Sequence, residues 1–217
     1  MGAPYQKTLT LSLVAAVVNG AAQSQSGTAA TPLTLNGSLV TGGVAVFDAP
    51  RRVGITSGGN DTGITFTIVG TDYFGRPQTE VLTGASGATA QTLRDFATVK
   101  SITPSGNTAS TVTAGTTTVG STPPHVLDAI ANPTSVSFAN IVSGVVNYTI
   151  EETFDDFSPA WNVNTTVPTW FATGMASQSA NSTGSLTEPA TMVRLTINSG
   201  TGTVTTRCIQ GLAARTA

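Results

Sequence analysis

The sequence has few of the residues from which catalytic and metal sites are built. Its 217 residues include one His, one Cys, nine basic and 11 acidic residues. Active sites and metal centres bring together His, Cys, Asp, Glu and Lys, so this composition offers little material for either. We therefore expect a protein that is not an enzyme, holds no metal or cofactor, and acts through its surfaces.

The single cysteine and the single histidine each have a simple expected role. One thiol cannot form a disulfide within the chain or build a cysteine metal cluster. Cys208 lies in the β-like run 203–209, where a small buried residue is expected. His125 follows two prolines and is expected to be a loop residue. A Ser-His-Asp triad is not indicated, because the sequence contains no Gly-x-Ser-x-Gly motif.

Charge is scarce and evenly spread. The formal net charge is −2, and Arg51-Arg52 is the only adjacent basic pair. Nucleic-acid-binding surfaces show a basic patch or stripe, so we expect no direct nucleic-acid binding. Charged residues make up 9% of the chain, against roughly a quarter in an average soluble domain. Such a surface resists association weakly, which favours a homo-oligomeric subunit whose faces are covered in an assembly.

The N-terminal residues imitate a signal peptide, with Lys7 followed by the apolar run 9–18. The match is imperfect, because Lys7 is the only charge before the run and Asn19 follows it directly. The run is too short to span a membrane, and no membrane partner is expected. We expect instead a strand or extended arm, residues 1–36, that docks on a partner or a neighbouring subunit.

Alternating apolar and polar residues are the main secondary-structure signal. They run through 64–68, 146–154 and 193–197. In the second run Phe154 is expected to face inward and Thr153 outward. One apolar and one polar face is typical of antiparallel strands with one side in water.

Glycine-rich turns separate these runs. Gly58-Gly59 is expected to form a hairpin turn, and Phe74–Pro77 to lead into a hairpin partner at 78–83. Residues 198–202 are expected to join the strands on either side as another hairpin. Many short strands with such turns predict an all-β fold of antiparallel β-sandwiches. Helix is expected to be minor, limited to a short turn at 90–96.

Pro123 and Pro124 mark the expected domain boundary, because two prolines break a ladder and stiffen a link. We expect two small β-sandwich domains, 37–122 and 123–217, preceded by the arm. A single larger sandwich built from both halves is the alternative.

Four acidic residues, Glu151, Glu152, Asp155 and Asp156, form the only dense acidic patch. A Ca²⁺ site and a pair of glycosidase carboxylates are the functional interpretations. Successive strand residues point to opposite faces, so Glu151 and Glu152 cannot share one site without a bulge. The expected role is therefore a solvated strand end that runs into a loop.

Aromatic residues gather in a segment with little periodicity, at Trp161, Trp170 and Phe171. They are expected either to anchor a partner or to cap the sandwich. The polar stretch 178–188 that follows is expected to be a surface loop.

Several segments together resemble one class of protein. The run APRRVGITSGGNDTGITFTIVGTD (49–72) leads into a Gly-Arg-Pro turn and Thr-Glu-Val-Leu-Thr-Gly (79–84). This stretch resembles a segment that recurs in structural proteins of tailed bacteriophages. Residues 142–156, with Val-Asn-Tyr-Thr-Ile-Glu at their centre, and residues 190–210 are similar to phage virion proteins as well.

The resemblance implies a structural component of the virion and brings no catalytic residues with it. The leading expectation is a capsid decoration (cement) protein, whose partners are the major capsid protein and copies of itself. The alternative is a component of a neck or tail ring below the portal. A third interpretation, from another class, is a carbohydrate-binding or depolymerising β protein that stacks sugars on Trp161 and Trp170.

Overall fold

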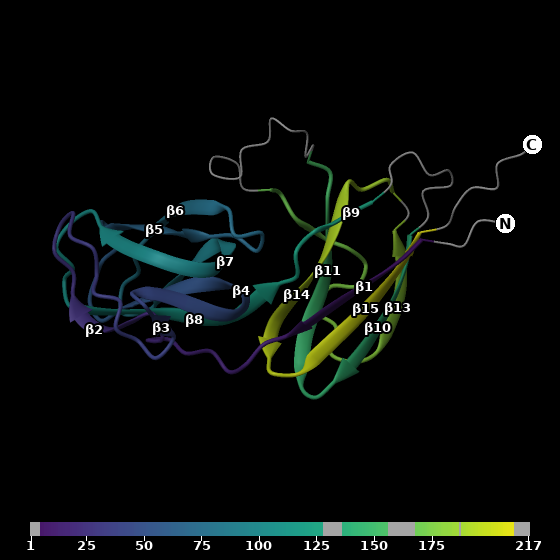
Figure 1. The fold of residues 1–217 in the computed structure, drawn as a ribbon, viewed down its shortest axis with the longest axis horizontal. Coiled ribbons are helices and arrows are strands. Elements are labelled where there is room, and N and C mark those ends of the chain that lie inside the picture. Colours follow the sequence, from purple (N-terminus) through teal and green to yellow (C-terminus); the bar gives the residue numbers. More distant parts are fainter. Residues whose placement is uncertain (1–4, 128–135, 156–167, 187, 211–217) are drawn as a thin grey trace, which may run out of the picture. The chain divides into compact units, whose positions relative to one another are not determined.

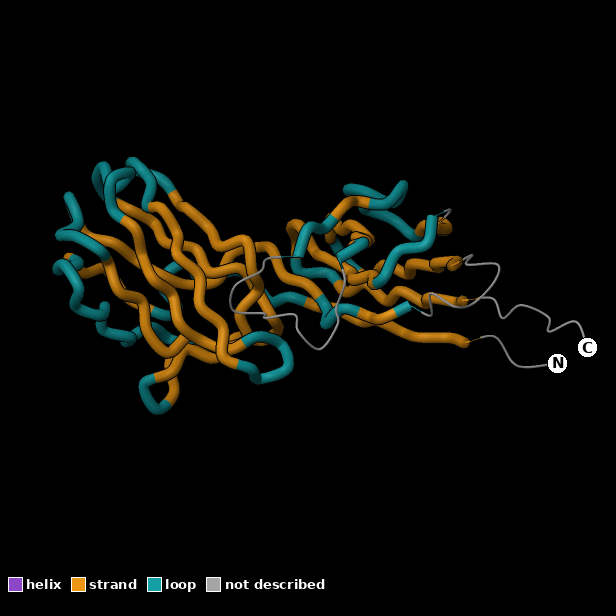
Figure 2. The backbone as a smooth tube through the Cα atoms, turned by 90° about the horizontal axis from the view of Figure 1, so that it is seen from above, coloured by secondary structure: helices purple, strands orange, loops and turns teal. Residues whose placement is uncertain are grey.

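The structure is a computed structural model that describes residues 5–127, 136–155, 168–186 and 188–210. Within these residues the regular elements are all strands, arranged in antiparallel sheets, which confirms the all-β expectation (Figure 2). The short helical turn expected at 90–96 is wrong. These residues belong to a long strand, β7 (Thr89–Pro104), whose backbone pairs with β4 (Val44–Ser57) and β5 (Thr65–Thr71). Within the described residues, no helix is long and apolar enough to cross a membrane.

The chain divides into two compact units, and the first unit is discontinuous in sequence. Unit 1 takes the residues up to Leu13 and most of those from Ser121 onward, whereas unit 2 contains Val14–Gly120. The division at Gly120 lies close to the expected boundary at Pro123. The N-terminal division differs from the expected arm, because the chain passes from one unit to the other at Leu13 and Val14.

Each unit has its own set of strands (Figure 1). The strands of unit 1 are β1 (Tyr5–Ser12), β9 (His125–Val126), β10 (Val136–Ser143), β11 (Val146–Thr153), β12 (Phe171–Ala172), β13 (Ser182–Leu186), β14 (Met192–Gly200) and β15 (Thr203–Gln210). Those of unit 2 are β2 (Ala22–Ser26), β3 (Val40–Thr41), β4, β5, β6 (Pro77–Thr83), β7 and β8 (Thr111–Ser121).

Unit 1 is a sandwich of two sheets. One sheet has the order β1-β15-β10-β13, and the other contains β12-β11-β14 with β9 paired to β14. The first strand of the chain therefore pairs with the last, in an unbroken register from Tyr5↔Gln210 to Ser12↔Thr203. This part of the expected arm is an integral strand of unit 1, because its alternating leucines face the core.

The core of unit 1 contains apolar side chains from both sheets and one buried polar network. Leu9, Leu11 and Leu13 on one sheet and Val193, Leu195 and Ile197 on the other are buried. The network begins at Thr206, whose Oγ1 donates to Asn140 Oδ1 at 2.7 Å. It continues from Asn140 Nδ2 through Ser182 Oγ to the hydroxyl of Tyr148 on the opposite sheet, over 3.0 and 2.8 Å. Because each polar group has a partner, the network links the sheets without leaving a buried orphan.

The hairpin expected at 198–202 is wrong, because β14 and β15 belong to different sheets. The chain instead crosses from one sheet to the other between β14 and β15. A second crossing joins β10 to β11. The two crossings lie against each other, since the amides of Thr201 and Gly202 donate to the carbonyl of Val145 at 3.1 and 2.9 Å. Gly200 has a φ of 93°, and a Cβ there would lie 2.3 Å from the Val145 oxygen.

Unit 2 has strands in the order β8-β4-β7-β5-β6, with β2 on β8 and β3 on β4. Its core is a single cluster of buried apolar residues: Ala21, Ala22, Leu33, Ala45, Phe47, Val53, Ile55, Phe66, Ile68, Phe96, Val99, Ile102, Val112 and Ala114. Residues 14–36 are part of this unit. The amides of Ala21 and Leu33 donate to the carbonyls of Ala114 and Ile102, and Leu33 lies in the core.

Of three further sequence-based expectations, the structure confirms one. The turn at Phe74–Pro77 is confirmed, because β5 and β6 form a hairpin with Gly75 at a φ of 75°. Gly58-Gly59 is not a hairpin turn, because β4 and β5 both pair with β7 and not with each other. The Gly58 amide instead donates to the Thr111 carbonyl. The stretch 178–188 contains the strand β13 and is not wholly a loop.

Gly200→Ala should destabilise unit 1. The new Cβ would need a backbone shift at Val145 and a φ that L side chains rarely adopt, so we expect a loss of about 3 kcal/mol in unfolding free energy. Urea denaturation measures it. Gly174→Ala is the matched control, because no atom lies within 4 Å of its Cβ position. Equal losses in the two variants would contradict this account of the crossing.

Lys7→Cys should form a disulfide with Cys208, because the two residues are directly opposite in the β1–β15 register. Closing a loop of nearly the whole chain should stabilise the protein by up to about 4 kcal/mol. Non-reducing gel mobility and thermal melts with and without reductant check this. Lys7→Cys combined with Cys208→Ala is the control. Failure to form an internal disulfide would contradict the register of β1.

Candidate functional site

The acidic residues of β11 do not converge on one site. Glu151 and Glu152 point to opposite faces of the strand, as expected for neighbours. Asp155 accepts a hydrogen bond from the Thr169 amide at 2.6 Å. Asp156 lies outside the described residues. Within the part of the chain that the structure describes, no group of three or more His, Cys, Asp or Glu is placed to hold a metal ion.

Glu151 has a structural role in a polar cluster with Arg194. Its Oε2 accepts from Arg194 Nε at 2.7 Å and from Thr196 Oγ1 at 2.6 Å. The guanidinium carbon of Arg194 lies 4.2 Å from the centroid of the Trp170 ring. Both Arg194 and Thr196 are buried, so the polar face expected to be wet on β14 is covered. A paired, stacked arginine tolerates this burial because its donors are used.

The neighbouring strand positions correct two further expectations. Thr153 is fully buried, and its carbonyl accepts from the amide and the hydroxyl of Thr191. Phe154 follows the strand and is 45% exposed, beside the exposed ring of Phe171. The alternation therefore ends before Phe154. Glu152, on the other face of the strand from Glu151, has its pKa raised by burial and then by nearby Glu188.

Cys208 lies on β15 and His125 on β9, which belong to different sheets. Cys208 is in the core, as expected, and burial raises the pKa of its thiol to about 11. At neutral pH the thiol stays protonated, which makes it a poor nucleophile. His125 is in the short strand β9 opposite Val193, not in a loop. Burial, and then the charge of Lys7, lower its pKa.

The aromatic residues are divided between packing and exposure. The ring of Trp170 covers Arg194, and Phe171 is half exposed beside Phe154. Trp161 lies outside the described residues. Trp170 thus packs on the polar face of β14, while Phe171 keeps an exposed face.

The outer face of the four-stranded sheet is the candidate functional site. It is built from alternate residues of four strands: Gln6, Thr8, Thr10 and Ser12 of β1; Thr203, Thr205, Arg207 and Ile209 of β15; Ser137, Ala139, Ile141 and Ser143 of β10; and Thr183 and Ser185 of β13. We call this set the outer face. Arg207 is the one charged member of the set.

The outer face suits contact with another protein better than chemistry. Its hydroxyls partly satisfy each other, as in the 3.1 Å hydrogen bond from Thr203 Oγ1 to Ser12 Oγ. Ile141 and Ile209 are 44% and 38% exposed. Covering such a surface desolvates almost no charge, and the centres of protein interfaces are depleted in charge for this reason.

Burial of charge makes the surface even less charged than the composition implies. Among the residues that the structure describes, six charged side chains are buried: Arg51, Asp61, Asp72, Arg94, Asp95 and Arg194. These buried charges contribute little to electrostatic repulsion between copies of the protein in solution. The scarcity of charge noted in the sequence becomes sharper at the surface.

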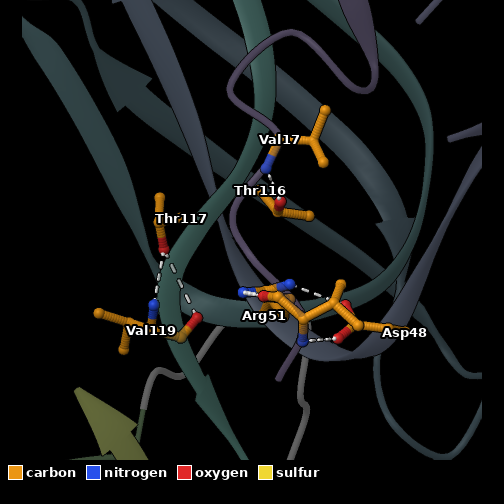
Figure 3. Close-up of polar contacts among 7 residues, drawn as sticks. Val17, Asp48, Arg51, Thr116, Thr117 and Val119 are labelled. Atoms are coloured by element: carbon orange, nitrogen blue, oxygen red, sulfur yellow. Dashed lines mark hydrogen bonds and ion pairs between the residues drawn. The ribbon is translucent and has the colours of Figure 1, made fainter. Parts of the chain in front are cut away.

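A polar clamp holds the chain just after β1 (Figure 3). Asp48 Oδ2 accepts from the Val14 amide at 2.9 Å, and Arg51 donates from one terminal nitrogen to the Val14 carbonyl at 2.8 Å. Arg51 also donates to Asp48 Oδ1 at 2.9 Å, which closes the ring. Three residues further on, the Val17 amide donates to Thr116 Oγ1 at 2.9 Å. The clamp engages both backbone polar groups of Val14, the first residue of unit 2.

Sequence reasoning missed both features, although each had a signal. Leu9, Leu11 and Leu13 alternate with Thr8, Thr10 and Ser12, which is a strand pattern that was interpreted as an apolar run. Arg51 was considered only as half of a basic pair. The spacing Asp48-x-x-Arg51 was the available sign of an ion pair, but nothing in the sequence connects it to Val14.

Arg51→Ala should destabilise the protein by about 3 kcal/mol, because it removes the buried guanidinium that bonds Asp48 Oδ1 and the Val14 carbonyl. Chemical denaturation measures the loss. The control is Arg76→Ala, which breaks the Asp72 ion pair where the arginine side chain is 45% exposed. That pair should contribute less, at most about 1 kcal/mol. A smaller loss for Arg51 than for Arg76 would contradict the role of the clamp.

Comparison with protein-family models, curated proteins and solved structures finds no match for this chain. What the chain does is therefore inferred from its own residues.

Proposed function

We propose that this chain is a non-enzymatic structural protein of a bacteriophage virion, and specifically a capsid decoration (cement) protein. It would bind copies of the major capsid protein after the shell has assembled. The observation that carries the proposal is the exposed outer face, which has a single charged side chain among its residues. The resemblance of 49–84, 142–156 and 190–210 to phage virion segments supports the kind of assembly.

Decoration stabilises a shell by mass action. A protein that binds the assembled lattice and not the free subunit shifts the equilibrium towards the lattice. At a free concentration about 100-fold above Kd, each occupied site gains about 2.7 kcal/mol. Many weakly charged contacts of this kind require no chemistry.

The outer face matches this task in its physical character. Threonine and serine hydroxyls can exchange water for hydrogen bonds to a neighbouring subunit, and Ile141 and Ile209 add apolar area. The face is part of a four-stranded sheet whose other side is packed, so little order is lost on binding. Preorganised surfaces convert more of their contact energy into affinity.

The alternatives have less support. A ring component of the neck or tail would have similar surfaces, and copy number distinguishes it from a decoration protein. The sugar-stacking interpretation is weakened, because Arg194 stacks on one face of the Trp170 ring that it would use.

Purified protein should bind expanded phage capsids in proportion to the number of capsid subunits, and it should protect them from heat. Gel densitometry of sedimented particles gives the copy number, and calorimetry gives the shift in capsid melting. Copies sufficient only for one ring would instead indicate the neck or tail. Binding to purified glycans, with none to capsids, would contradict the proposal.

Ile141→Asp should weaken capsid binding at least about tenfold, because it places a charge at the centre of the outer face. Val81→Asp is the matched control. Val81, like Ile141, is an exposed β-branched apolar residue (61%), but it lies on β6 in unit 2. Sedimentation with labelled protein measures both. Equal binding by Ile141→Asp and the unchanged protein would remove the outer face from the interface.

A further inference from the structure

Strand β1 forms one edge of its sheet. It pairs with β15 on one side and, within the described residues, with no second strand on the other. Its outward side chains, from Gln6 to Ser12, are exposed. An edge strand offers a row of backbone donors and acceptors to any strand that approaches it.

The other edges of the described sheets carry protective features. Strands β9 and β12 are two residues long, and β13 has five. In unit 2, β2 has an irregular register, and the side chain of its Gln25 bonds the backbone of Thr34 at both its amide and its carbonyl. Strand β6 begins at Pro77, and its Glu80 carboxylate accepts from the amides of Leu93 and Arg94. Short length, bulges, proline and charge are the usual means of preventing edge pairing.

Strand β1 has little of this protection. It has eight residues in unbroken register and contains neither proline nor glycine, and Lys7 is its only charged residue. A long, regular, weakly charged edge is suited to pairing with another strand.

We propose that β1 pairs antiparallel with β1 of a second copy of this chain, around a two-fold axis perpendicular to the sheet. Two copies of the strand can pair without repulsion between like charges, because Lys7 is the only charged residue in each. Any register centred between residues 8 and 11 keeps the two Lys7 side chains out of direct opposition, so no like charges face each other. The pairing joins two four-stranded sheets into one and places the two outer faces side by side on the same surface.

The inference goes beyond the proposed function, because it concerns how two copies meet in solution, whatever assembly they enter. It would also double the area of the outer face offered to a partner. An isologous contact of this kind closes at two copies, which prevents the edge from extending into a fibre.

A cysteine scan on purified full-length protein tests the register. Single variants Thr8→Cys, Thr10→Cys and Ser12→Cys are made in a Cys208→Ala background and oxidised alone and in equimolar mixtures. Two-fold pairing predicts that one position, or one mixed pair of positions, dominates the disulfide-linked dimer on a non-reducing gel. Thr183→Cys on β13, at the other edge of the same face, is the control and should give little dimer.

Sedimentation equilibrium tests the energetics. The unchanged protein should dimerise, and Thr8→Lys combined with Thr10→Lys should raise the dimer dissociation constant at least about tenfold. Thr183→Lys should leave it unchanged. A protein that is monomeric at all concentrations, a dimer that the β1 lysines do not weaken, or equal crosslinking at β1 and β13 would each overturn the proposal. Capsid binding by a monomeric protein would overturn it while leaving the proposed function intact.

Discussion

The pairing of the first strand with the last is the constraint on which the rest of unit 1 depends. Strand β1 lies beside β15, although the chain between them leaves unit 1 after Leu13 and returns to it at Ser121. The leucines of β1 complete a core that the later strands of unit 1 begin. The same pairing turns Gln6, Thr8, Thr10 and Ser12 outward, which extends the outer face, and it leaves β1 at the edge of its sheet. The candidate interface is thus a direct consequence of one long-range strand pairing.

Several polar side chains of this protein form hydrogen bonds and ion pairs within its fold. Arg51 holds the backbone of Val14, Glu151 and Arg194 pair under the ring of Trp170, and Thr206, Asn140 and Ser182 link the two sheets of unit 1. Buried polar groups are costly unless they are satisfied, and these have partners. Such networks favour a single arrangement of the strands, while the surface keeps few charges. Low surface charge then favours association, which is the physical link between the packing and the proposed role.

Much of the fold could be predicted from the sequence, and so could the kind of surface. The all-β class, the β5–β6 hairpin, the buried Cys208 and the boundary near Pro123 follow from local patterns. The expected hairpin at 198–202 failed because a glycine-rich turn is the same in sequence whether the chain returns beside itself or crosses to another sheet. The expected helical turn at 90–96 failed because strand pairing overrides weak local preference.

By itself, the sequence determined the scarcity of charge, of histidine and of cysteine and the strand periodicity, since these are properties of composition and local order. Only the tertiary structure decided which strands are neighbours, that Arg51 clamps Val14, and that the exposed threonines of β1, β15 and β10 share one face. These depend on contacts between residues far apart in the chain, such as Thr10 and Thr205. Local pattern sets which side of a strand is polar, whereas pairing sets which polar sides meet.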